Sequence, residues 1–179
     1  MLIVYIIALA VVSVALVLTR WPSLISTAPH KLWSSELKGK KCVVTGGGNG
    51  LGKEIVQKLI SIGADVAAVD RDIGALKTLQ DEVDGAGNLH IIAMDLLEPN
   101  STQTVVDDCI RALHGIDLWI NNAGVCVFGR IDEDNYTTEK NVRIQTHLNL
   151  VAPMLITRNL LLALQKAEKT SSLGIAFTG

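Results

Sequence analysis

The stretch Thr45-Gly46-Gly47-Gly48-Asn49-Gly50-Leu51-Gly52 decides the fold of this chain. It follows the short β-branched run KCVVT at 41–45 and precedes a segment, 53–60, whose apolar residues recur at helical spacing. A glycine-rich loop between a strand and a helix permits a tight turn and a close approach of the backbone to a pyrophosphate. The helix N-terminus adds unpaired N–H groups and the positive end of the helix dipole. The sequence therefore predicts a dinucleotide-binding loop at 45–52.

From Lys40 onward the chain alternates strand-like runs with segments of helical period. Such alternation is typical of a parallel α/β sheet. Asp72 is a candidate N-cap for the helix that follows the second strand. A long helical stretch is expected over 138–167, interrupted by Pro153. The later predicted strands are DVAAVD (65–70), LHIIAMD (89–95), DLWINNAG (117–124, with its exit loop) and LGIAFT (173–178).

Acidic residues follow the second and third predicted strands. Asp70 lies roughly 20 residues beyond the glycine loop, where a carboxylate can bond the ribose hydroxyls of adenosine. A carboxylate there repels a 2′-phosphate, which favours NAD over NADP, although the adjacent Arg71 could offset the repulsion. Asp95-Leu96 lies at the same carboxyl edge, where open α/β sheets bind ligands. The alternatives are a solvated turn for Asp70 and a helix or turn cap for Asp95.

Three motifs occur in the order typical of one family: the loop spacing Thr-Gly-x-x-x-Gly-x-Gly, then Asp95-Leu96, then Asn121-Asn122-Ala123-Gly124. Residues 38–179 resemble the short-chain dehydrogenase/reductase family through them. The resemblance implies a Rossmann-type doubly wound parallel sheet, incomplete at about five strands, in the order 3-2-1-4-5. The implied cofactor contacts are Gly46, Asn49, Gly50, Leu51 and Gly52 at the pyrophosphate and ribose, Asp70 at the adenine ribose, Asp95 and Leu96 at the adenine, and Asn122, Ala123 and Gly124 along the cofactor.

The resemblance also extends to one catalytic residue. His147-Leu148-Asn149-Leu150 is similar to the helical segment with the family's active-site asparagine, so Asn149 would help to hold a water-mediated proton relay. The family's serine follows strand five and precedes Tyr-x-x-x-Lys, whereas this sequence reads Ala176-Phe177-Thr178-Gly179 there. Tyr136 and Lys140 have the Tyr-x-x-x-Lys spacing but precede Asn149, the wrong order for the family. We therefore expect a fragment or truncated isoform, inactive alone.

The N-terminus reads as a membrane anchor. Residues 1–19 carry no charged side chain, and as a helix they would span roughly 28 Å, close to the thickness of a bilayer core. Basic residues follow the run and none precedes it, which places the domain in the cytosol, at the endoplasmic reticulum or a lipid droplet. We predict an anchor at 1–19, a linker at 20–38 and an NAD(P)-binding domain at 39–179. A cleaved signal peptide, which would make a secreted protein, is the alternative.

The charge and the cysteine pattern of the sequence argue against some classes of function. A net charge of −2 without a basic run argues against nucleic acid. The cysteines at 42, 109 and 126 show no metal spacing and read as reduced core thiols. The family resemblance and the anchor together predict hydride transfer between NAD(P) and a lipophilic alcohol or ketone of retinoid, steroid or sphingoid type, in a possible homodimer. The alternatives are a non-catalytic, membrane-tethered nucleotide-binding protein and an extended-type epimerase, which the loop spacing disfavours.

Overall fold

The computed structural model describes residues 36–85, 87–127, 130, 138–166 and 173–178. Residues 37–179 form one compact unit. The predicted anchor at 1–19 lies outside the described residues, as does the predicted linker up to residue 35.

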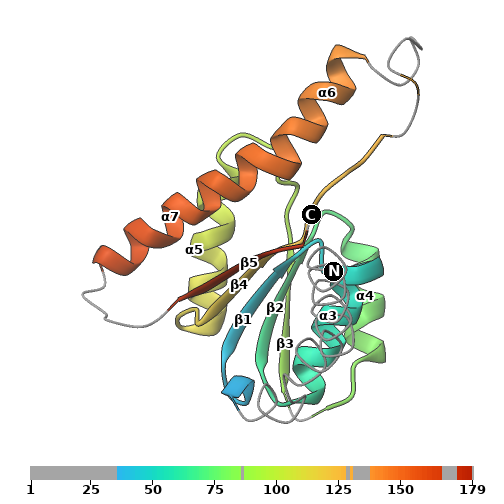
Figure 1. The fold of residues 1–179 in the computed structure, drawn as a ribbon. Coiled ribbons are helices and arrows are strands. Elements are labelled where there is room, and N and C mark those ends of the chain that lie inside the picture. Colours follow the sequence, from blue (N-terminus) through green and yellow to red (C-terminus); the bar gives the residue numbers. More distant parts are fainter. Residues whose placement is uncertain (1–35, 86, 128–129, 131–137, 167–172, 179) are drawn as a thin grey trace, which may run out of the picture. The chain divides into compact units, whose positions relative to one another are not determined.

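Five parallel strands form one sheet in the order β3-β2-β1-β4-β5 (Figure 1), which confirms the order expected from the family. Two of the predicted strands match residue for residue, and the other three differ only in their ends. The register pairs Val43 of β1 with Ala67 of β2 on one side and with Trp119 of β4 on the other. The strands are β1 (Lys41–Thr45), β2 (Asp65–Asp70), β3 (Asn88–Ala93), β4 (Leu118–Asn121) and β5 (Gly174–Phe177).

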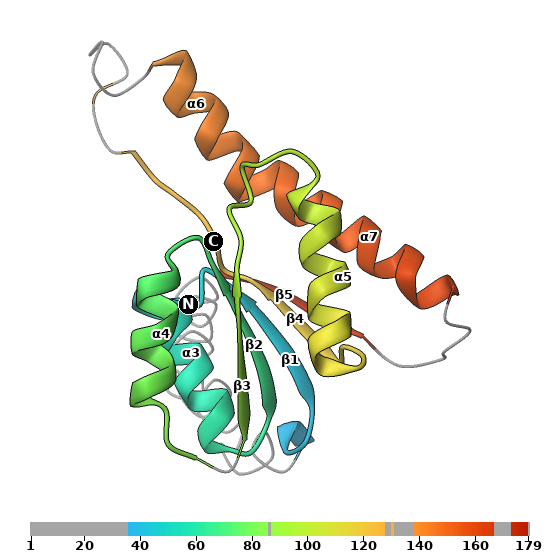
Figure 2. The ribbon, with the colours of Figure 1, turned by 180° about the vertical axis from the view of Figure 1, so that it is seen from behind.

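Helices cover both faces of this sheet (Figures 1 and 2). Two of them, α3 (Gly50–Ser61) and α4 (Ile73–Glu82), lie on one face. The other face carries α5 (Ser101–Leu113) and α7 (Ala152–Lys166). The same helical segment begins with α6 (Glu139–Thr146), which projects beyond the sheet, and reaches α7 through η1 (His147–Val151). Each helix between two strands is a crossover of a parallel sheet, as the alternation of the sequence predicts.

The core has two layers because the central strands bury both of their faces. In β1, Val43 belongs to the cluster under α5 and α7, whereas Cys42 and Val44 belong to the cluster under α3 and α4. This alternation is the period of two that a strand imposes on its side chains. Trp119 of β4 is fully buried on the α5–α7 side, where it is the largest fully buried side chain among the described residues.

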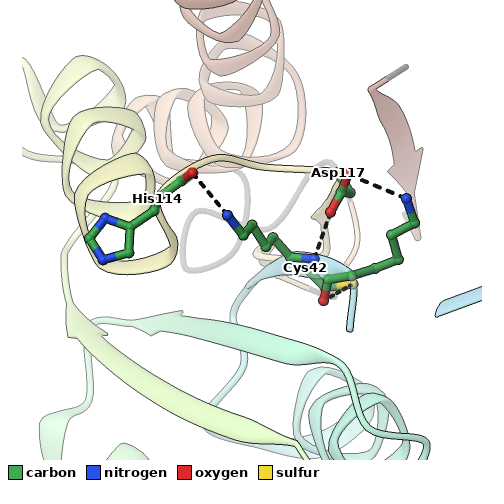
Figure 3. A network of polar contacts seen from close by, with 5 residues as sticks. Cys42, His114 and Asp117 are labelled. Carbon is green, nitrogen blue, oxygen red and sulfur yellow. Dashed lines mark hydrogen bonds and ion pairs between the residues drawn. The ribbon is translucent and has the colours of Figure 1, made fainter. Parts of the chain in front are cut away.

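Polar contacts hold the amino ends of β1 and β4 together (Figure 3). The Asp117 carboxylate accepts a hydrogen bond from the Lys41 backbone N–H at 2.9 Å and lies 3.6 Å from the Lys40 ammonium. The Lys41 ammonium donates to the carbonyl of His114, the C-cap of α5, at 2.9 Å. A cation at the C-terminus of a helix also complements the helix dipole. These contacts fix the edge of the sheet opposite to the predicted ligand site.

The expected interruption at Pro153 takes the form of a π-helical turn just before this residue, and the chain stays helical through it. Proline has no N–H, so it cannot bond the carbonyl of Asn149 four residues earlier. The chain responds with a π-helical turn at His147–Val151, in which the Ala152 N–H reaches back to the His147 carbonyl, and the helix continues. Among the described residues, Glu139–Gln165 is the one helix whose length and apolarity would suffice to cross a membrane. That result rests on length and composition alone, and this helix packs against α5.

Candidate active site

A cavity of about 410 Å³ lies where the strands end at their carboxyl side. Residues that follow β1, end β2 and follow β3 and β4 all line it, as expected for a ligand site of an open α/β sheet. Ten of the predicted cofactor residues meet there: Gly46, Asn49, Leu51, Gly52, Asp70, Asp95, Leu96, Asn122, Ala123 and Gly124. The structure does not place Gly50 or Asn149 on the wall of this cavity; Asn149 lines a neighbouring hollow.

The glycine loop is held by the loop after β4. The Asn122 side-chain amide donates to the carbonyls of Thr45 and Gly46 at 3.0 and 3.1 Å and accepts from the Thr178 hydroxyl at 3.0 Å. The Thr45 hydroxyl in turn accepts from the backbone N–H groups of Asn122 and Ala123. The side-chain amide of Asn122 therefore has protein partners on both its nitrogen and its oxygen. Its contribution to the cavity is to hold the glycine loop in place.

The N-terminus of α3 borders the cavity and carries no side-chain cap. Asn49 is its N-cap but makes no side-chain capping bond, and the first turn holds no acidic residue. By contrast, Asp72 caps α4 through the Ala75 N–H, as predicted, and Thr138 caps α6. The first N–H groups of a helix have no acceptor within the helix. Those of α3, together with its dipole, are therefore available to an anion.

Asp70 lies at the end of β2 with its carboxylate directed into the loops. Its Oδ2 accepts from the Gly48 N–H at 3.0 Å and its Oδ1 from the Asp72 N–H at 3.0 Å. An ionised carboxylate has about four acceptor sites. Asp70 can therefore hold these two backbone groups and still accept the hydroxyls of a ribose. Its neighbour Arg71 lines the same cavity.

The loop after β3 forms another part of the wall. The Asp95 side chain accepts from the Leu97 N–H at 2.9 Å, so it serves as a turn cap while it also lines the cavity. Leu96 is 5% exposed and packs into the core under α5 and α7. Its carbonyl lies 3.1 Å from Nε2 of His147 in the π-helical turn.

Asn149 clamps the loop after β4. Its Oδ1 accepts from the Val125 N–H and its Nδ2 donates to the Val125 carbonyl, both at 2.9 Å. One turn earlier, Oε1 of Gln145 accepts from the Val127 N–H at 3.0 Å. Asn149, Cys126, Pro153 and other residues line a second hollow of about 400 Å³ at the end of β4 and β5. Tyr136, the other half of the rejected Tyr-x-x-x-Lys match, lies outside the described residues.

Sequence reasoning missed several apolar residues of the main cavity. Val69 and Met94 adjoin predicted site residues on β2 and after β3, and Val125 directly follows the Asn-Asn-Ala-Gly motif. Ile144 and Leu148 come from the distant helix. Their spacing of four residues would have predicted a shared helix face, but the sequence carries no signal for what that face meets.

The three thiols differ in environment. Cys42 and Cys109 are buried, whereas Cys126 is exposed, so the prediction of core thiols is wrong for Cys126. Burial, and then the negative charges of Asp117 and Asp65, raise the pKa of Cys42 to about 12. Burial likewise raises the pKa of Cys109. Neither buried thiol is a nucleophile at neutral pH. Within the described residues there is no group of three or more His, Cys, Asp or Glu that could hold a metal ion.

Comparisons with known proteins agree with this geometry. A short-chain dehydrogenase of Pseudocercospora fijiensis is 31% identical over 138 residues, which are 76% of this chain and 44% of that protein. A 3beta-hydroxysteroid dehydrogenase 2 of Eggerthella lenta is 33% identical over 90 residues, 50% of this chain and 35% of that one. The crystal structure of a metagenomic short-chain oxidoreductase in complex with NADP has a TM-score of 0.68 and 30% identity, covering 79% of this chain and 61% of the other.

The chain spans less than half the length of the two curated relatives. Its match to a family model is nevertheless broad: the model described as short chain dehydrogenase covers residues 40–175. With the five-stranded sheet and the three motifs at its carboxyl edge, this match shows that the chain belongs to the short-chain dehydrogenase family.

Proposed function

We propose that this chain binds NAD(P) in the cavity at the carboxyl edge of its sheet and serves an oxidoreductase that acts on a lipophilic alcohol or ketone. The observation that carries the proposal is the convergence of four strand ends on one cavity between an uncapped helix N-terminus and Asp70. Bound there, the nicotinamide would supply the hydride chemistry. The chain's own residues would bind the dinucleotide and orient it.

The residues of the cavity fit such a cofactor. A Cβ on Gly52 would overlap the Gly46 carbonyl, so this position keeps the first turn of α3 close to the loop. The free N–H groups of that turn suit a pyrophosphate. Leu51, Val69 and Leu96 offer apolar surface to the flat rings of a dinucleotide, and Asp70 offers acceptors to a ribose.

We propose NAD as the preferred cofactor. The Asp70 carboxylate lies at the end of β2, held by two backbone N–H groups, and a carboxylate at this place repels the 2′-phosphate of NADP. Arg71 lines the same cavity and would attract that phosphate. A solved relative was crystallised in complex with NADP, so membership of the family does not by itself favour NAD. The balance in this chain depends on which of the two charges lies nearer to the 2′ position.

The substrate end would lie beside Asn149. The side-chain amide of Asn149 is engaged with Val125, and Pro153 denies its carbonyl the usual helical bond. We propose that this carbonyl accepts a bond from the water of a proton relay. A lipophilic substrate is supported by the predicted anchor at 1–19 and by the steroid named in a relative. We propose that the anchor tethers a cytosolic domain to the endoplasmic reticulum or a lipid droplet.

Equilibrium binding of NADH and NADPH to the full chain, kept in a mild non-ionic detergent, tests the cofactor proposal. We expect NADH to bind more tightly. Asp70→Asn removes the charge that bonds the ribose, and hydrogen bonds to charged groups contribute about 1.5–3 kcal/mol. NADH should therefore bind roughly ten- to a hundredfold more weakly to this variant, with a smaller change for NADPH.

Asp81→Asn is the matched control, because Asp81 is an exposed carboxylate of α4 that does not line the cavity. Its affinity for both cofactors should equal that of the wild type. Absence of binding of either cofactor to the folded wild-type chain would refute the proposal. Tighter binding of NADPH than of NADH would overturn the preference alone.

A further inference from the structure

The π-helical turn His147–Val151 touches both walls of the nucleotide cavity. On one side, Nε2 of His147 lies 3.1 Å from the carbonyl oxygen of Leu96, in the loop after β3. On the other side, the Asn149 side chain holds the backbone of Val125, in the loop after β4. Leu148, between them, lines the cavity and packs against the core cluster that contains Leu96. One turn of helix therefore spans the distance between two loops that follow different strands.

The contact of His147 is directional. A carbonyl oxygen can only accept, so the ring nitrogen Nε2 must carry the proton and donate it. The loop that receives this bond is otherwise braced from within, by the Leu97 N–H on the Asp95 carboxylate and by the Glu98 N–H on the Asp95 carbonyl. Besides the packing of Leu96 and Met94 against the core under α5 and α7, the His147 bond joins this short loop directly to the π-helical turn.

We propose that His147 is a positioning residue that fixes the Leu96 wall of the nucleotide cavity relative to the turn that carries Asn149. The proposal rests on the function proposed above, because it concerns where the adenosine half of the dinucleotide lies. Asp70 and Leu96 mark that half of the cavity, whereas Asn149 lines the neighbouring hollow at the ends of β4 and β5. Loss of the bond frees the loop at Leu96 and weakens the adenosine half of the site first.

The test compares His147→Leu with His147→Gln in the full chain. Leucine removes the donor, whereas the amide nitrogen of glutamine reaches about as far from the backbone as Nε2 and can donate the same bond. A net hydrogen bond contributes about 0.5–1.5 kcal/mol, so His147→Leu should bind NADH and ADP-ribose about two- to twelvefold more weakly. His147→Gln should bind both ligands nearly as tightly as the wild type. Binding of nicotinamide mononucleotide should change little in either variant.

His90→Leu is the matched control, since His90 is another half-buried histidine that lies on β3 and does not line the cavity. It should leave all three affinities unchanged. If His147 had a purely structural role, His147→Leu would lower the stability of the fold and weaken the binding of all three ligands equally. His147→Gln would then not restore the binding of NADH and ADP-ribose selectively. Equal ADP-ribose affinity in folded wild type and His147→Leu overturns the proposal, as does an equal loss in the leucine and glutamine variants.

Hydrogen exchange of the ligand-free chain separates this proposal from the proposed function. The N–H groups of Leu97 and Glu98 are bonded within the loop, so their exchange reports its order. His147→Leu should raise exchange in the peptide that spans 94–98, and His147→Gln should not. If the wild type binds no NADH but exchange follows this pattern, the cofactor function fails and the positioning role stands. Unchanged exchange in His147→Leu overturns the positioning role.

Discussion

Replacing Gly52 by alanine tests the packing on which the cofactor loop depends. A Cβ at this position would overlap the carbonyl oxygen of Gly46 and lie 2.5 Å from Nδ2 of Asn122. Neither neighbour can move freely, because the Asn122 amide is bonded to the carbonyls of Thr45 and Gly46 and to the Thr178 hydroxyl. The strain must therefore spread through the loop after β1 and the loop after β4 together.

The magnitude follows from this rigidity. Overpacking a well-packed site costs about 1–3 kcal/mol, and the upper end applies where backbone atoms must shift. We therefore expect Gly52→Ala to lower the free energy of unfolding by about 3 kcal/mol. Gly50→Ala is the control: its Cβ would meet nothing within 4 Å, but its φ is +52°. A left-handed alanine costs about 1–2 kcal/mol, and the loss of glycine entropy in the unfolded chain returns about 0.4–1 kcal/mol.

Urea unfolding followed by far-ultraviolet circular dichroism measures the stability of both variants through the loss of their secondary structure. The Gly52→Ala midpoint should lie clearly below that of Gly50→Ala, and NADH affinity should fall with it. An equal or higher midpoint for Gly52→Ala would show that the contact with Gly46 does not constrain the loop, and the reasoning would fail.

The remaining predictions concern the thiols. At pH 8 Ellman's reagent should modify Cys126 in the folded chain and reach Cys42 and Cys109 only on unfolding. Cys126→Ser should therefore abolish the fast reaction. Equal reaction rates for the three thiols would contradict the burial of Cys42 and Cys109. Because the pKa of Cys42 is raised from 9.0 to about 12, the folded state keeps a proton that the unfolded chain releases. Stability should therefore fall above pH 9 by about 1.4 kcal/mol per pH unit from this thiol. Cys42→Ala should flatten that decline in urea titrations from pH 9 to 11, and parallel curves for variant and wild type would refute the assignment.

The sequence by itself determined the order of the elements and most of the residues at the carboxyl edge of the sheet. β1 and β2 match their predicted runs residue for residue, because strands buried on both faces read as continuous apolar or β-branched segments. The cap at Asp72 is equally local, since its side chain bonds an N–H three residues away. The end of a parallel strand predicts a ligand edge without any knowledge of the loops. For this reason ten predicted residues meet in one cavity.

Only the tertiary structure decided how those residues are used. The Asn122 amide is bonded to the loop after β1 because β1 and β4 are neighbouring strands. The Asn149 amide is bonded to Val125 because the π-helical turn lies against the loop after β4. Cys126 is exposed although its residue type favours burial, since it lies in the loop after β4 and belongs to neither core cluster. Pro153 is accommodated by a π-helical turn where an interruption was expected, and α7, which follows the turn, packs on α5. Such contacts join residues far apart in the chain, and no local pattern encodes which of them will meet.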